Sequence, residues 1–148
     1  MWAIVPDRPG DAEKTFQKWS EFAGCVAESG IPKALAVQDG MTVESVKSLQ
    51  ILPDVICVGG TTGWKWATVE LWAKNFKRVH LLRCNMPDKL DYLQSLGVES
   101  CDGTGWNRGD RRQTEGLERW AKRNANPIEH EMFHFVSRSN CKKQMCFA

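Results

Sequence analysis

The sequence has no long apolar run, no tandem repeat and no low-complexity segment. A membrane-spanning helix needs about 20 consecutive apolar residues, so we expect no transmembrane segment. The opening stretch "MWAIVPDRPGD" has neither the basic nor the apolar region of a secretory signal. With 148 residues, of which 42% are hydrophobic and 26% charged, the chain has the size and composition of one globular domain.

The sequence also has no strong excess of basic over acidic residues, or of acidic over basic ones. The formal net charge of +2 does not by itself indicate nucleic-acid binding, although basic residues gather late, in "NRGDRR" and "AKRN". The six cysteines are scattered along the chain. Cys57, Cys84 and Cys101 lie in or beside apolar, strand-like runs, where a reduced cysteine behaves as a small hydrophobic residue. We therefore predict a reduced, cytoplasmic protein.

Short apolar runs alternate with amphipathic stretches at intervals of roughly 20–30 residues, the size of one β–α unit. This alternation predicts an α/β protein with a parallel sheet. Asp11 and Thr42 are the predicted N-caps of the first two helices. The predicted strands cover residues 2–5, 33–37, 54–58, 78–84 and 98–102, and the predicted helices cover residues 10–30, 42–52, 62–76, 86–97 and 109–124.

Two architectures fit five such units. One is an open, doubly wound sheet of five strands. The other is an incomplete TIM barrel, since a complete (β/α)₈ barrel normally needs about 250 residues. Periodicity alone does not separate them. In either case we expect a β/α domain over residues 1–124, followed by a C-terminal tail over residues 125–148.

Each predicted strand ends in polar residues or glycines. Such residues are common in ordinary turns, but the carboxyl ends of parallel strands are also where α/β proteins place their chemistry. Five such ends together favour a site. The residues predicted to converge on this rim are Asp7, Gln38, Asp39, Gly59, Gly60 and Asp102.

Four of these stretches resemble motifs of the tRNA-guanine transglycosylase superfamily, in the same order. They are "AIVPDRPGDAEKTFQKW", "ALAVQDGM", "CVGGTTGWKW" and "RVHLLRCNMPDKLDYLQSLGVESCDGTGWNRGDR". The similarity covers about residues 2–123 and is greatest to compact phage-encoded relatives, which would place the protein in the cytoplasm of a bacterial host.

The resemblance implies a pentosyltransferase that exchanges a guanine-type base. It implies that Asp102 is the nucleophile, that Asp7 and Gln38 hydrogen-bond the base, and that Gly59 and Gly60 hold it through their backbone. We also expect Asp39, Lys65 and Arg83 to contact the substrate, which would be a purine or 7-deazaguanine base in tRNA or DNA. No cofactor is required. The alternative is a catalytically degenerate phage accessory protein that binds a nucleotide, a base or a protein partner.

Two elements of the family pattern are missing. The Asp-Ser/Asn-Gly motif, which carries the second catalytic aspartate on an earlier strand in that family, has no counterpart. The resemblance therefore implies that the chain starts at about the fourth strand of the barrel. The Cys-x-Cys-x-x-Cys…His zinc insert is absent too. Because an incomplete barrel leaves unpaired strand edges, we predict a homo-oligomer or a partner chain that completes the barrel.

The tail contains "IEHEMFHFV", in which His130, Glu131 and His134 have the His-Glu-x-x-His spacing of zinc peptidases. A peptidase needs this motif on a long helix of a catalytic fold, with a third ligand downstream, whereas here it follows the last β–α unit. His130 and His134 with Cys141 and Cys146 are instead candidate ligands of a structural zinc. An amphipathic tail without metal is the simpler alternative.

Overall fold

The computed structural model of the protein describes residues 1–124. Five parallel strands form one sheet in the order β1-β2-β3-β4-β5. This result confirms the predicted α/β class with its parallel sheet. The strands are β1 (Ala3–Ile4), β2 (Lys33–Val37), β3 (Val55–Val58), β4 (Val79–Leu81) and β5 (Ser100–Cys101).

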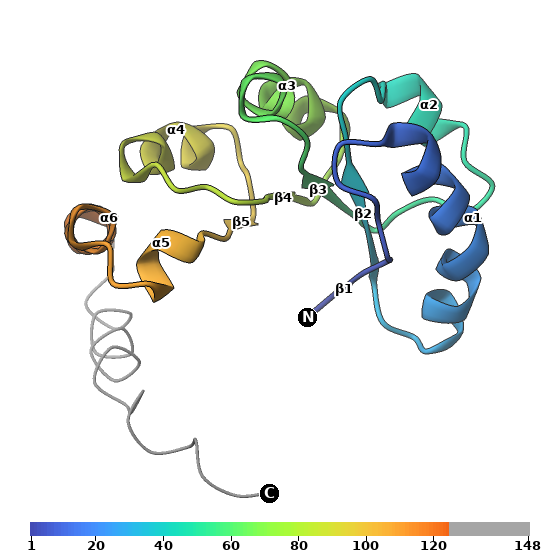
Figure 1. Cartoon of the computed structure of the whole chain (residues 1–148), viewed down its shortest axis with the longest axis horizontal. Helices are drawn as coiled ribbons and strands as arrows, with labels where there is room; N and C mark the ends of the chain where they lie inside the picture. The colour runs from blue at the N-terminus through green and yellow to red at the C-terminus, as the bar shows by residue number, and fades with distance from the viewer. Residues whose placement is uncertain (125–148) are drawn as a thin grey trace, which may run out of the picture.

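The helices lie between the strands and after them, as Figure 1 shows. Asp11 caps the first helix by accepting a hydrogen bond from the backbone of Lys14, and Thr42 caps the second through a capping box with Ser45, so both predicted N-caps are confirmed. The helices are α1 (Ala12–Glu28), α2 (Val43–Lys47), α3 (Thr62–Asn75), the 3₁₀ helix η1 (Pro87–Lys89), α4 (Leu90–Ser95), α5 (Thr104–Asn107) and α6 (Arg111–Asn124).

The second helix is shorter than predicted and ends at Lys47. Pro53 disfavours a helical conformation just before it. The carbonyl of Ile51 also accepts a hydrogen bond from the indole Nε1 of Trp19, 2.9 Å away, so this segment packs on α1 instead of continuing the helix. The short helix α5 was not predicted from the sequence.

The strand order decides between the two architectures. Every strand pairs with its neighbours in sequence, and no pair reverses the order as a doubly wound sheet requires. Successive right-handed crossovers in one direction place their helices on the same face of the sheet. The result is a curled half-barrel, with helices α1 to α4 in an arc outside the strands (Figure 1).

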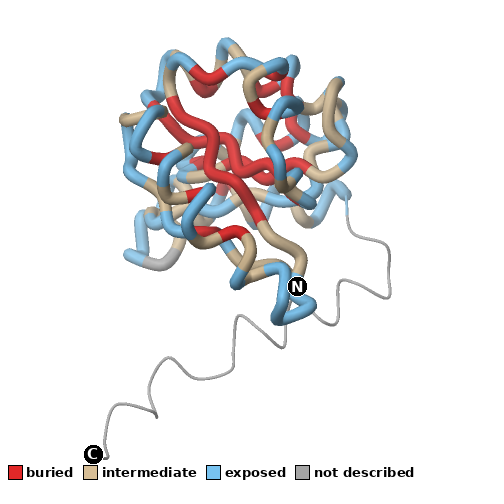
Figure 2. The backbone as a smooth tube through the Cα atoms, turned by 90° about the vertical axis from the view of Figure 1, so that its right-hand side faces the viewer, coloured by how far each residue is buried: buried red, intermediate tan, exposed pale blue. Residues whose placement is uncertain are grey.

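The two faces of the sheet differ in what covers them. Leu35, Val37, Ile56 and Val58 point to the helices and join a core that includes Trp19, Val69 and Trp72. On the concave face Ala34, Ala36, Val55 and Cys57 form a second cluster, against which the partly buried hydrophobic residues Trp2 and Leu82 pack. Figure 2 shows the buried segments in red through the middle of the molecule. Small side chains therefore line the concave face at the centre of the sheet. No helix within residues 1–124 is both long and apolar enough to span a bilayer.

A pair of glycine substitutions tests how α6 docks. A Cβ at Gly116 would overlap the Cβ of Pro87 in η1 and lie 2.7 Å from its Cγ, whereas a Cβ at Gly63 in α3 would meet no atom within 4 Å. Helix propensity favours alanine over glycine by about 1 kcal/mol. We expect Gly63→Ala to stabilise the protein by up to that amount. Gly116→Ala should instead destabilise it by about 1–3 kcal/mol, because overpacking outweighs propensity.

Urea unfolding of both variants measures the two effects. Equal stabilisation by Gly63→Ala and Gly116→Ala would show that α6 does not pack against Pro87.

Candidate active site at the carboxyl ends of the strands

The side chain of Gln38 joins the ends of three strands. It is only 2% exposed. Its Nε2 donates to Oδ2 of Asp7 at 2.8 Å, and its Oε1 accepts from the backbone N–H groups of Gly10 at 3.0 Å and Gly60 at 3.1 Å. A glutamine amide has two donor and two acceptor positions, so one N–H is left. The structure thus brings Asp7, Gln38 and Gly60 together, as predicted, through bonds within the protein.

The carboxylate of Asp39 is held by the first turn of α3. It accepts from the Thr61 backbone at 2.6 Å and from the Thr61 hydroxyl at 2.5 Å. The hydroxyl bond is the main cause that lowers the pKa of Asp39. Gly60 has φ +74°, and a Cβ there would overlap Asp39 and lie 2.9 Å from Cε3 of Trp64. Glycine is therefore required at this position by the packing of the protein itself.

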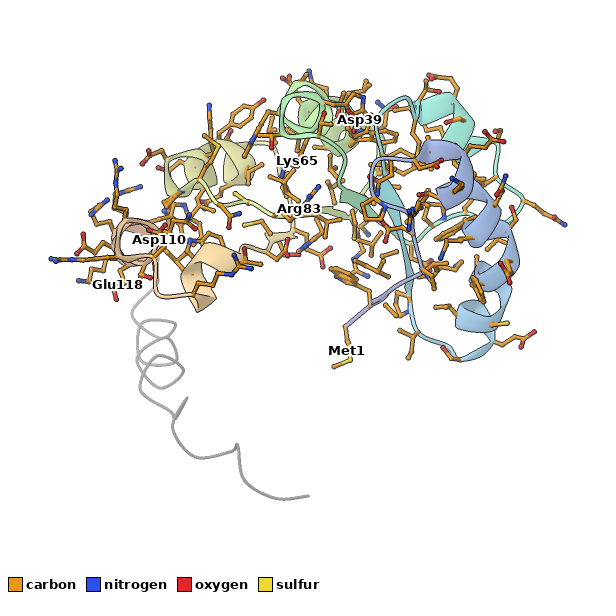
Figure 3. The ribbon with its side chains drawn as sticks, viewed as in Figure 1. Met1, Asp39, Lys65, Arg83, Asp110 and Glu118 are labelled. Atoms are coloured by element: carbon orange, nitrogen blue, oxygen red, sulfur yellow. The ribbon has the colours of Figure 1, made fainter. Side chains whose placement is uncertain are left out.

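The side chains of Lys65 and Arg83 donate hydrogen bonds to backbone carbonyls at the ends of β3 and β4. Lys65 is 3% exposed, and its Nζ donates to the carbonyls of Leu82 at 2.7 Å and Arg83 at 3.1 Å. Burial, followed by the charge of Arg83, lowers the pKa of Lys65. Arg83 has φ +54° and donates from Nη2 to the carbonyl of Gly60 at 2.7 Å. Figure 3 labels both residues near β4, beneath α3.

Asp102 follows β5, and its side chain is half-exposed, at 51%. Its Oδ1 accepts from the backbone N–H of Arg83 at 2.6 Å. Within residues 1–124, Oδ2 has no hydrogen-bond partner. One oxygen of the carboxylate is therefore fixed and the other is open.

Asp7 and Asp102 act on the same part of the concave face, although they follow the two edge strands. Burial raises the pKa of the Cys57 thiol to about 12, and the charges of Asp102 and Asp7 add to this rise. Cys57 belongs to the central strand β3. The charges of both predicted rim carboxylates therefore act on the same residue of the central strand.

His80 is a polar residue of this region that was not predicted as a site residue from the sequence. It lies on the concave face of β4 and is 7% exposed, with the ring of Trp2 edge-on at 5.0 Å. Its Nδ1 lies 2.8 Å from Oγ of Ser100 and its Nε2 lies 3.5 Å from Oδ1 of Asp102. Burial lowers the pKa of His80, and the Asp102 carboxylate opposes this shift. The available signal was its position inside "RVHLLRC", two residues before Leu82 on the same face of the strand.

The four cysteines within residues 1–124 are free. Cys57 is fully buried and acts as a small apolar side chain. A hydrogen bond from the thiol of Cys101 lowers the pKa of the Cys84 thiol below its ordinary value.

The predicted zinc ligands His130, His134, Cys141 and Cys146 lie outside the described residues, as does the predicted tail. Within residues 1–124, no group of three or more His, Cys, Asp or Glu side chains is arranged to hold a metal ion.

No family model matches this chain, and no curated protein or solved structure matches it either.

The hydrogen bonds of Gln38 can be tested by two substitutions. Gln38→Leu removes the acceptor of two backbone N–H groups, and each group left unpaired costs about 1–3 kcal/mol. We expect a loss of about 2–6 kcal/mol in the free energy of unfolding. Unchanged stability would contradict the role of Gln38 as the link between the strand ends.

Gln38→Glu is the matched control, because it keeps the acceptor. At pH 7 the introduced carboxylate faces Asp7, and the repulsion raises its pKa in the folded state. Stability should therefore be low at pH 7 and rise as the pH falls toward 5, where the protonated group donates to Asp7 as the amide does. Denaturant unfolding at both pH values measures this gain.

Proposed function

We propose that the protein acts on the N-glycosidic bond of a purine-like nucleoside unit and exchanges its base, with Asp102 as the nucleophile. The observation that carries the proposal is the geometry of Asp102: Arg83 N–H fixes Oδ1, while within residues 1–124 Oδ2 has no hydrogen-bond partner and the side chain is half-exposed. This is the arrangement that a carboxylate nucleophile needs, because attack requires one free oxygen in a set orientation.

In the proposed reaction, Oδ2 of Asp102 attacks the anomeric carbon of the sugar. The bond from that carbon to the base nitrogen breaks, the base leaves with the bonding electrons and takes up a proton, and a glycosyl ester remains. An incoming base then attacks the same carbon, releases the carboxylate and loses its proton. No oxidant or metal is needed to balance these steps.

Asp7 is the second carboxylate of the proposed site. Gln38 holds Oδ2 of Asp7 at 2.8 Å, and the remaining acceptor capacity of that carboxylate suits the N–H donors on the edge of a guanine-type base. In this proposal Gln38 chiefly orients Asp7, and its one remaining N–H is what it offers to the base.

The second candidate is a protein that binds a base or nucleotide without turnover. The hydrogen bonds of the rim side chains favour this candidate. Gln38, Lys65 and Arg83 each bond to backbone groups of the protein, which leaves them fewer donors and acceptors for a substrate. The two candidates share a binding site and differ only in whether Asp102 forms a bond.

A trapping experiment separates them. The protein is incubated with RNA and DNA stem-loops that contain guanine, together with labelled guanine, and base incorporation and protein mass are measured. Exchange should occur with one of the two nucleic acids and should be lost in Asp102→Asn. Asp54→Asn is the matched control, because Asp54 pairs with Lys33 at the opposite ends of the strands.

Binding of guanine or the stem-loop without incorporation or adduct would support the second candidate. Activity that persists in Asp102→Asn would contradict the assigned nucleophile.

We further propose that a second copy or a partner chain completes the barrel. Within residues 1–124, β1 and β5 each pair on one side only. In β1 the neighbouring N–H groups of Ala3 and Val5 bond to the carbonyls of Pro32 and Ala34 in the direction of β2. The N–H of Ile4 therefore points to the free edge. An added strand would bond to it.

Ile4→Pro tests this proposal, because it removes the outward N–H without removing a bond to β2. Light scattering should find an assembly larger than the monomer, weakened by Ile4→Pro and kept by Ile4→Val. A monomeric wild-type protein with full exchange activity would contradict it.

A further inference from the structure

Ser100, His80 and Asp102 form a continuous polar contact on the concave face of β4 and β5. His80 and Ser100 are directly paired in the register of the two strands. Ser100 Oγ lies 2.8 Å from His80 Nδ1, and His80 Nε2 lies 3.5 Å from Asp102 Oδ1. Each of the two ring nitrogens therefore faces a different polar side chain.

The partners of His80 select one arrangement of protons. A neutral imidazole carries its hydrogen on only one nitrogen. If Nδ1 carried it, the lone pair of Nε2 would face the carboxylate of Asp102, which is unfavourable. If Nε2 carries it, Nε2 donates toward Asp102 and Nδ1 accepts from the hydroxyl of Ser100. In this arrangement Ser100 donates to His80, and His80 in turn donates toward Asp102.

The surroundings of His80 keep the ring neutral. It is 7% exposed, Trp2 covers it edge-on, and its register partner on the other side is Cys57, whose thiol is protonated because burial raises its pKa to about 12. The charged groups that act on it are Asp102 and Glu99, and burial outweighs both. A buried neutral ring that is hydrogen-bonded to Ser100 on one nitrogen and lies 3.5 Å from the Asp102 carboxylate on the other is suited to orienting that carboxylate.

We propose that His80, itself oriented by Ser100, is a positioning residue that holds Oδ1 of Asp102 and so directs Oδ2 toward the substrate. The proposal deepens the proposed function of Asp102 and rests on it. Arg83 N–H, just after β4, and His80 Nε2–H, within β4, then approach the same oxygen of Asp102, and the other oxygen is kept for reaction. Because His80 is nearly covered, it acts through Asp102 and does not contact the substrate.

The first test does not depend on activity. Long-range ¹H–¹⁵N NMR of the full chain at pH 7 reports which ring nitrogen of each of its three histidines is protonated, and the signals lost in His80→Gln identify His80. We expect His80 as the neutral Nε2–H tautomer. A neutral Nδ1–H tautomer or a doubly protonated ring would overturn the proposal.

The second test uses base exchange. Gln places its own Nε2 near the position of the histidine Nε2, so His80→Gln should keep most of kcat. His80→Phe, of similar size but without the donor, should lower kcat by roughly 100-fold, the cost of misplacing a reacting group by about 1 Å, with KM little changed. Ser100→Ala should lower kcat by less, because Asp102 still favours the Nε2–H tautomer.

The outcomes separate the two proposals. Equal loss of kcat in folded His80→Gln and His80→Phe would overturn positioning by His80. An Nε2–H tautomer in a wild-type protein that exchanges no base would contradict the proposed function, while the orientation of Asp102 by His80 would stand.

Discussion

The structure of residues 1–124 depends on one constraint: each of its strands pairs in parallel only with its neighbours in sequence. All right-handed crossovers then advance in one direction and put their helices on one face. The crossovers place no helix on the other face, which is concave. Where the sheet curls, the side chains of that face pack against one another, so they must be small or complementary in shape. Ala34, Ala36 and Cys57 meet this requirement, and all three are almost completely buried.

The same constraint explains why the polar residues gather where they do. Parallel strands that advance in order bring all five carboxyl ends to one rim, so residues far apart in sequence become neighbours. Gln38 bridges 31 residues to Asp7 and 22 residues to Gly60. A buried amide in this position must find partners for its donors and acceptors, and finding them ties the first three strand ends together. The polar rim therefore contributes to the stability of the half-barrel.

Periodicity predicted the five strands, because each is an apolar run between turn residues, and it predicted the helix starts at Asp11 and Thr42, because capping is local. Strand order could not be read from periodicity, since both candidate architectures have the same alternation. The rim residues were found because they follow the strands directly. What they bond to was not predictable: Lys65 and Arg83 look like substrate ligands in the sequence, yet their donors reach backbone carbonyls that only the fold brings close. His80 was missed because its partners Ser100 and Asp102 lie on another strand.

The hydrogen bonds of Lys65 and Arg83 determine which polar groups at the rim remain available to a ligand. Lys65 and Arg83 both direct nitrogens to carbonyls at the end of β3 or β4, so their hydrogen bonds hold the rim in shape. Asp7 and Asp102 keep acceptor capacity of their own. A rim whose unpaired polar atoms belong to carboxylates favours ligands that have N–H donors. It also favours reactions in which positive charge develops on the substrate. The cleavage of an N-glycosidic bond has both features, because the purine edge presents donors and the sugar carbon becomes cationic in the transition state. In the proposed function, the preference for such a ligand comes from the carboxylates of Asp7 and Asp102, because the nearby cationic side chains of Lys65 and Arg83 bond to backbone carbonyls.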